Sequence, residues 1–120
     1  MNPNDLQNRT KEFALRVMKL SSFLEKDSLG RLIGRQIFRS GTSVAANYRA
    51  ACKSKSVKDF ISKLGIVVEE ADETSFWLEL LKDSETIQGD KIDALLQEAK
   101  EITAIMVASR SSAIKNQRAK

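Results

Sequence analysis

The sequence contains no histidine and only one cysteine in 120 residues. Without histidine it lacks the commonest general base and metal ligand, and the single Cys52 excludes an internal disulfide framework and is typical of a reducing cytoplasm. No apolar run approaches the roughly 18 residues that a transmembrane helix needs, and the N-terminal residues lack the order of a signal peptide. We therefore expect a cytoplasmic protein that is not an enzyme, holds no metal or other cofactor and has no membrane partner.

Residues that interrupt helices are equally scarce, with one proline and five glycines. Local propensity therefore favours helix nearly everywhere. Apolar residues recur at helical spacing in four segments, with breaks at KDSLG, before Ser56 and at QGD: residues 5–24, 29–53, 57–84 and 90–113. Short connections favour antiparallel neighbours, which predicts an all-α, up-down-up-down four-helix bundle in a single domain, residues 1–120.

Charge is divided unevenly along the chain. Residues 1–58 carry twelve Lys and Arg against four Asp and Glu, whereas residues 59–120 carry eight against twelve, so the net charge of +4 is the sum of +8 and −4. Two interpretations stay open. The halves pair their charges within one folded chain, or the first half presents a basic surface to a partner.

The second predicted helix carries a basic stripe. At about 100° per residue, five cationic side chains fall within an arc of about 80°, provided that the helix continues through Gly41. They are Arg31, Arg35, Arg39, Arg49 and Lys53. One hypothesis is that they contact phosphates of RNA or DNA. The alternative is that they pair with carboxylates of the third predicted helix, namely Glu69, Glu70 and Glu73.

Two other sides of this helix are apolar. The predicted core face holds Leu29, Ile33, Ile37, Val44, Tyr48 and Ala51. A second sector combines small residues with Phe38, and the third predicted helix also has a second apolar flank. Packing inside the bundle and a subunit interface both explain these extra sides. The candidate interface residues are Gly34, Phe38, Gly41, Ala45, Ile66, Phe76 and Trp77.

The other polar residues form no catalytic constellation. The acidic cluster at residues 69–73 has no histidine with which to build a di-metal bundle site, so we interpret it either as a solvated face or as partners for the arginines of the second predicted helix. Cys52 has no histidine base and is interpreted as a small hydrophobic residue. We expect structural roles for Ser43 and Asn47, with Asn47 fixing helix register because an unpaired buried amide costs about 1–3 kcal/mol.

The segment from Gly41 to Leu81 carries a motif. Ser-Val-x-x-Asn falls on Ser43, Val44 and Asn47, followed by Asp59-Phe60, Glu73 and Trp77-Leu78. This pattern resembles the S23-like family of four-helix proteins encoded in intervening sequences of bacterial large-subunit rRNA genes. Many members continue after the asparagine with Ile-Ala-Glu-Gly, whereas this chain has Tyr-Arg-Ala-Ala at residues 48–51. Any role that the glutamate has in those members therefore cannot be assigned to a residue of this chain.

The resemblance implies a ring-like homopentamer without established enzymatic activity. Related proteins are accessory factors of diversity-generating retroelements, which implies a reverse transcriptase or another protein, together with RNA or DNA, as partners by analogy. Two functions therefore stay open: an oligomeric nucleic-acid-binding accessory protein, and a structural or protein-interaction scaffold without a nucleic-acid ligand.

Overall fold

The computed structural model describes residues 1–119, apart from the side chain of residue 91, and contains four helices. They are α1 (Pro3–Leu24), α2 (Ser28–Cys52), α3 (Val57–Asp83) and α4 (Asp90–Arg118). Seven of the eight predicted helix ends agree within two residues. The predicted end of the last helix at residue 113 is wrong, because α4 continues to Arg118.

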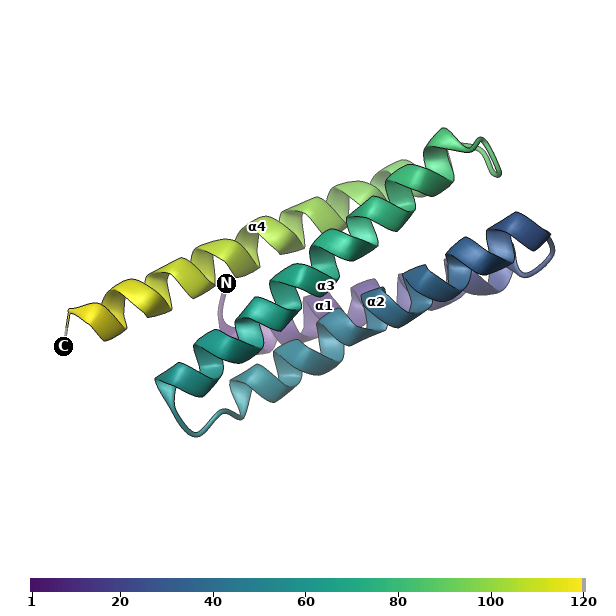
Figure 1. Cartoon of the computed structure of the whole chain (residues 1–120). Coiled ribbons are helices and arrows are strands. Elements are labelled where there is room, and N and C mark those ends of the chain that lie inside the picture. Colours follow the sequence, from purple (N-terminus) through teal and green to yellow (C-terminus); the bar gives the residue numbers. More distant parts are fainter. Residues whose placement is uncertain (120) are drawn as a thin grey trace.

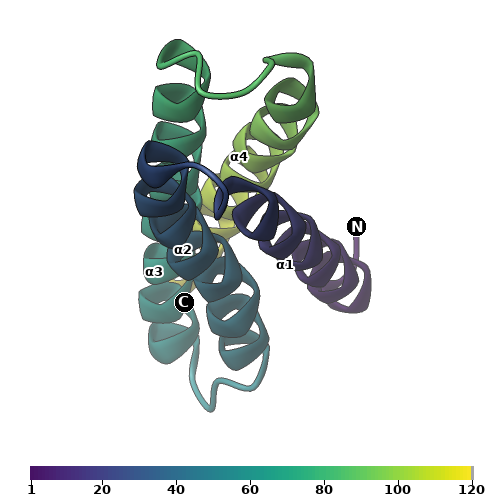
Figure 2. The ribbon, with the colours of Figure 1, turned by 90° about the vertical axis from the view of Figure 1, so that its right-hand side faces the viewer.

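The helices pack in chain order as an antiparallel bundle, which confirms the predicted all-α, up-down-up-down fold (Figure 1). The pairs α1–α2, α2–α3 and α3–α4 make extensive contacts, whereas α1 and α4 meet only over a short stretch. Figure 2 shows that α1 and α4 diverge from each other, so the bundle is open along one edge. None of the helices, over the part of the chain described, is long and apolar enough to cross a bilayer.

Three helices begin at side-chain caps. Asn2 accepts a hydrogen bond from the Asp5 amide, the Asp27 carboxylate accepts from the Gly30 amide, and Ser56 Oγ accepts from the Asp59 amide at 3.0 Å. The Ser56 cap agrees with the predicted start of the third helix. The Asp59 carboxylate forms an ion pair with Lys63, one turn further along the helix.

The core consists of the apolar stripes expected from the sequence. Each helix contributes a side chain that is 0% exposed: Val17 of α1, Ile37 of α2, Leu78 of α3 and Ile102 of α4. Twenty buried apolar residues form one cluster. Leu29 was predicted to belong to the core face but is 49% exposed, so that prediction is wrong. It lies in the first turn of α2, at the end of the bundle, where the neighbouring helices do not cover it.

Buried hydroxyl groups connect the helices inside this core. Thr74 of α3 donates to Ser40 Oγ of α2 at 2.8 Å, and Ser21 of α1 donates to the Gly34 carbonyl of α2 at 3.1 Å. Unpaired, such groups would each cost about 1–3 kcal/mol. Because a helix slide would break these bonds, they fix the register of α2 against both neighbours.

An ion-pair cluster joins the two helices at the open edge. Arg9 of α1 donates through Nε and Nη2 to the Glu98 carboxylate of α4 at 2.8 and 2.6 Å, and Nη2 also contacts Glu101 at 3.1 Å. The hydrogen bonds to Glu98 raise the pKa of Arg9 further above its already high value, so the guanidinium stays charged. The side chains of Arg9 and Glu98 are only 23% and 18% exposed.

We expect Arg9→Gln to destabilise the protein by about 1–2 kcal/mol, because it leaves the partly buried Glu98 without its guanidinium partner. The measurement is urea unfolding at a fixed protein concentration. Lys82→Gln is the matched control, since it removes an exposed cation that pairs with Asp93 and is expected to leave stability nearly unchanged. Equal effects of the two substitutions would show that Arg9 does not hold this edge together.

Candidate functional site

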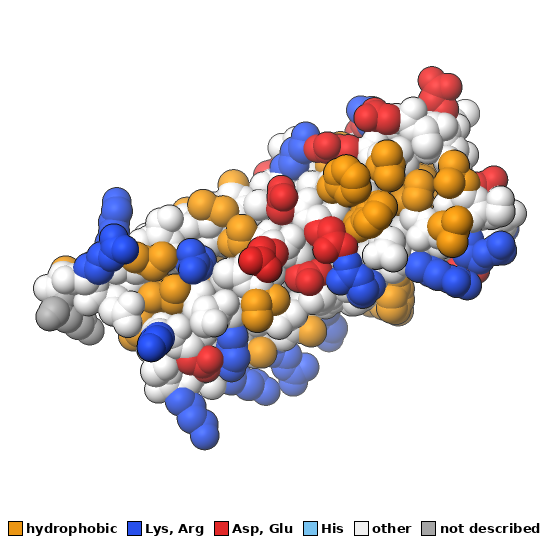
Figure 3. All heavy atoms as spheres, viewed as in Figure 1, with side chains coloured by type: hydrophobic (Ala, Val, Ile, Leu, Met, Phe, Trp, Pro, Cys, Tyr) orange, Lys and Arg blue, Asp and Glu red, His pale blue; other side chains and the backbone are white. Residues whose placement is uncertain are grey.

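The basic stripe of α2 depends on the helix being continuous, and α2 runs through Gly41 without a break. All five members of the stripe are exposed. In Figure 3, Lys and Arg side chains gather along the lower edge, over the C-terminal half of α2 and the turn to α3, while Asp and Glu side chains gather over α3. On the face shown in Figure 3, the charge asymmetry of the sequence is therefore largely a separation between the C-terminal half of α2 and α3.

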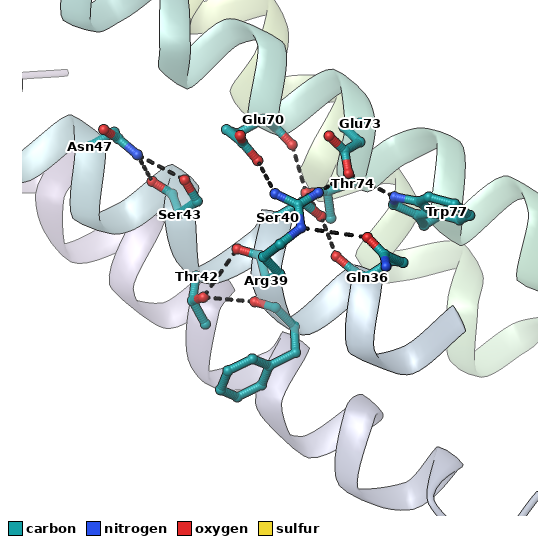
Figure 4. Close-up of polar contacts among 11 residues, drawn as sticks. Gln36, Arg39, Ser40, Thr42, Ser43, Asn47, Glu70, Glu73, Thr74 and Trp77 are labelled. Carbon is teal, nitrogen blue, oxygen red and sulfur yellow. Dashed lines mark hydrogen bonds and ion pairs between the residues drawn. The ribbon is translucent and has the colours of Figure 1, made fainter. Parts of the chain in front are cut away.

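Arg39 differs from the rest of the stripe, because carboxylates of α3 neutralise it. Its Nη1 lies 3.3 Å from Glu70 Oε2, and its Nη2 contacts Glu73 Oε2 (Figure 4). Glu73 also accepts a hydrogen bond from Trp77 Nε1 at 2.9 Å. For Arg39 alone, the predicted pairing with the acidic cluster is therefore the observed arrangement.

The other four cations of the stripe remain available to an anionic ligand. Arg31, Arg35, Arg49 and Lys53 form no ion pair with any residue that the structure describes. Arg49 and Lys53 share a groove between α1 and α2 with Lys11, which sequence reasoning missed. The sequence pattern of α1 indicates only that Lys11 lies on the polar side of that helix. Which helix lies next to Lys11 is known only from the folded structure.

Two candidate interface residues have their explanation within the chain. A Cβ atom on Gly41 would lie 2.7 Å from Val17 Cγ2, and one on Gly34 would lie 3.3 Å from Leu24 Cβ. Both glycines are buried. Their small size therefore serves the close approach of α1 to α2, which was the intrachain alternative. Ala45 is half-buried and lines the α1–α2 groove.

The remaining candidate interface residues lie at the surface. Phe38, Ile66 and Phe76 are 44%, 42% and 53% exposed, and Trp77 is half-buried against Phe76 with ring centroids 5.1 Å apart. Figure 3 shows hydrophobic side chains gathered over the N-terminal half of α2 and the C-terminal half of α3. The apolar patch is defined here as four exposed residues of these two segments, Leu29, Leu32, Phe76 and Leu80. Phe38 is not part of it, because it lines a groove with Met18 of α1.

A model of the family described as 23S rRNA-intervening sequence protein matches residues 3–108. The chain belongs to this family. A crystal structure of a protein with unknown function from the S23 ribosomal protein family of Bacteroides thetaiotaomicron is 36% identical. The match covers 92% of this chain and 99% of that one, with a TM-score of 0.86. No curated protein matches the chain.

Ser43 and Asn47 form the polar pair of the motif by which the chain resembles other 23S rRNA-intervening sequence proteins. Asn47 Nδ2 donates to the Ser43 carbonyl at 2.9 Å and to Ser43 Oγ at 2.8 Å (Figure 4). Both residues are half-buried. Both bonds lie within α2, and among the described residues Asn47 bonds to no other helix, so it does not fix the register as expected. The Ser40–Thr74 bond, which the sequence reading missed, does so instead.

Other motif residues also act within the fold. Val44 and Leu78 are 0% exposed, and Glu73 links Arg39 of α2 to Trp77. No group of three or more carboxylate or cysteine side chains in the described part of the chain could hold a metal ion. In this member of the family, the motif thus builds the α2–α3 pair and its surface.

Cys52 lies next to Tyr48 near the end of α2. Burial, followed by a hydrogen bond with Cys52, raises the pKa of Tyr48 well above its usual value, so the phenol stays protonated at physiological pH. Cys52 itself is half-buried and lines a hollow with Pro3, Lys55 and Phe60. Because no histidine exists to serve as its base, this arrangement supplies a packing residue without a catalytic pair.

Proposed function

We propose that this chain is a non-enzymatic, homo-oligomeric helical bundle that binds nucleic acid through the outer face of α2. The observation that carries the proposal is the set of exposed cations on that face without ion pairs among the described residues: Arg31, Arg35, Arg49 and Lys53. An unneutralised basic face attracts polyanions, and each phosphate contact contributes a salt-dependent gain in affinity.

Oligomerisation would strengthen such binding. A ring repeats the basic face once per subunit, so a long polyanion meets several faces at once and gains avidity. The apolar patch supports self-association, because a folded chain that exposes several large apolar side chains together has surface to bury. A pentamer is the assembly that the family resemblance implies.

The first test compares two charge reversals on α2. We expect Arg35→Glu to weaken binding of generic RNA and DNA at least ten-fold at 150 mM salt, because it removes one phosphate contact and adds a repulsion. Its oligomer mass by light scattering should stay unchanged. Arg39→Glu should instead lower the thermal midpoint, because it places a third carboxylate beside Glu70 and Glu73.

The contrast between these variants also tests the scaffold alternative, which the pairing of Arg39 with α3 favours. If the wild type binds neither RNA nor DNA at 50 mM salt, or if Arg35→Glu leaves binding unchanged, the nucleic-acid proposal fails. If Arg35→Glu dissociates the oligomer, that arginine has a structural role and the scaffold is the better account.

A further inference from the structure

A groove runs between the N-terminal half of α1 and the C-terminal half of α2, with a volume of about 530 Å³. Its lining residues are Gln7, Asn8, Lys11, Thr42, Ala45, Ala46, Arg49 and Lys53. We propose that this groove holds one part of the bound phosphate backbone, which continues along α2 to Arg35, with Lys11 of α1 as a direct contact. The inference rests on the proposed function and extends the binding surface from a stripe on one helix to a cradle between two.

The charges of the groove are of one sign. Lys11, Arg49 and Lys53 are exposed, and none of them forms an ion pair with a described residue. No carboxylate contributes to the lining. Arg49 and Lys53 are one helical turn apart, about 6 Å along the axis, so both cations can face neighbouring phosphates of one strand. Lys11 adds a third cation from the opposite wall.

The remaining lining favours a phosphate backbone over a protein partner. Its apolar side chains are only Ala45 and Ala46, so it lacks the large anchor residues that dominate protein interfaces. Small residues between the cations also let a strand approach the α2 backbone closely. Gln7 and Asn8 add amide donors for which the described residues supply no partner. The Thr42 hydroxyl is already committed to the Phe38 carbonyl at 2.7 Å.

The lining also indicates how the strand is recognised. It contains no aromatic side chain on which a base could stack, and its charged residues, Lys11, Arg49 and Lys53, suit phosphate oxygens. Contacts to phosphate oxygens carry no sequence information. We therefore expect binding that depends strongly on salt and hardly at all on sequence.

Arg49 and Lys53 have a second explanation that does not involve a ligand. They lie at the C-terminal end of α2, where cations are favoured by the helix dipole at about 0.3–1 kcal/mol each. Lys11 lies in the middle of α1, where no such benefit applies. Substitution of Lys11 is therefore the sharpest test of the cradle.

The experiment measures the binding of a 20-base-pair duplex DNA between 50 and 200 mM salt. Lys11→Gln is expected to reduce the slope of log affinity against log salt by about 1 per bound chain and to weaken binding about five-fold at 150 mM salt. The matched control is Lys100→Gln, which removes the same charge from α4, a helix that does not contact α2. Its slope and affinity should equal those of the wild type.

Three results would overturn the cradle. If Lys11→Gln keeps the wild-type slope while Arg31→Gln and Arg35→Gln reduce it, the proposed function stands and the binding surface is the other half of α2. If poly-L-glutamate competes with the labelled duplex as well as unlabelled duplex does at equal charge concentration, the groove attracts any polyanion and the phosphate assignment is wrong. If the wild type does not bind duplex DNA or single-stranded RNA at 50 mM salt, the proposed function itself fails.

Discussion

Gly41→Ala is expected to destabilise the protein by about 1–2 kcal/mol and Gly41→Leu by about 3 kcal/mol or more, a large part of the stability of a small domain. The direction of the Gly41→Ala effect is informative, because replacing glycine by alanine in a helix interior normally stabilises a protein by about 1 kcal/mol. Here we expect overpacking against α1 to exceed that gain.

The reason lies in the contact between Gly41 and Val17. A Cβ atom on Gly41 would lie 2.7 and 2.9 Å from the two γ-carbons of Val17, closer than van der Waals contact allows. Val17 is 0% exposed, and its β-branched side chain has one strongly preferred rotamer in a helix. Rotation of the Val17 side chain still leaves a methyl group near the new atom and does not move Val17 Cβ, which would lie 3.2 Å from it. Relief of the strain therefore requires α1 to move away from α2.

The measurement is the free energy of unfolding in urea at one fixed protein concentration, because the proposed self-association would make apparent stability depend on concentration. Gly65→Ala is the matched control, since its new Cβ would lie 3.3 Å from Nε near the end of the long Arg110 side chain, which donates to the Ile61 carbonyl, and should change stability by less than about 1 kcal/mol. Combining Gly41→Ala with Val17→Ala should restore at least about 1 kcal/mol relative to the sum of the single changes. Additive effects would show that this contact does not determine the spacing of the two helices.

The sequence pattern was sufficient for the helices and most of the core. Periodicity indicates which side of a helix is apolar, and the breaks at KDSLG and QGD separate the segments. The pattern failed at Leu29, because periodicity says nothing about where a neighbouring helix ends. It also left the glycine sector undecided, since close approach of α1 and contact with another subunit require the same small residues.

The candidate site was only partly predictable for a related reason. A helical wheel places Arg35 and Arg39 on one stripe, because they are only 40° apart around the helix axis. In the folded chain, however, the two side chains have different surroundings. Only the packing of α3 brings Glu70 and Glu73 within reach of Arg39 while leaving Arg35 unpaired. Lys11 likewise joins the groove only through the antiparallel pairing of α1 and α2. Sites composed of residues from two helices require the register between them, which single-sequence patterns do not contain.

Phe76→Asp is expected to convert the proposed homo-oligomer into single chains. Phe76 is 53% exposed and belongs to the apolar patch, so the substitution removes an apolar contact and buries an unpaired charge wherever another subunit covers this surface. Truncating or charging such a residue costs about 2–5 kcal/mol at each interface, and the cost is repeated around a closed ring. The fold should persist, because the side chain contributes little to the core.

A head-to-tail ring needs two different surfaces on each chain, and the structure offers a second apolar surface. Leu15 and Met18 of α1 and Phe38 of α2 are 42–45% exposed, and Met18 and Phe38 line one groove. Phe38→Asp should therefore dissociate the oligomer as Phe76→Asp does. A mixture of the two variants should form a dimer, because each chain keeps one intact surface.

Light scattering gives the mass, and circular dichroism shows whether the helices remain. Emission from Trp77, the only tryptophan and a direct neighbour of Phe76, provides a local signal of exposure when the interface opens. Val107→Asp is the matched control, since it charges a 47% exposed apolar position on α4, outside both surfaces. An unchanged mass for Phe76→Asp would place the interface elsewhere.

The same variant also separates avidity from binding by one chain. Binding through the proposed cradle does not require a ring. If monomeric Phe76→Asp still binds duplex DNA, but more weakly than the wild type, the lost affinity is the contribution of avidity and the remaining affinity is that of the groove.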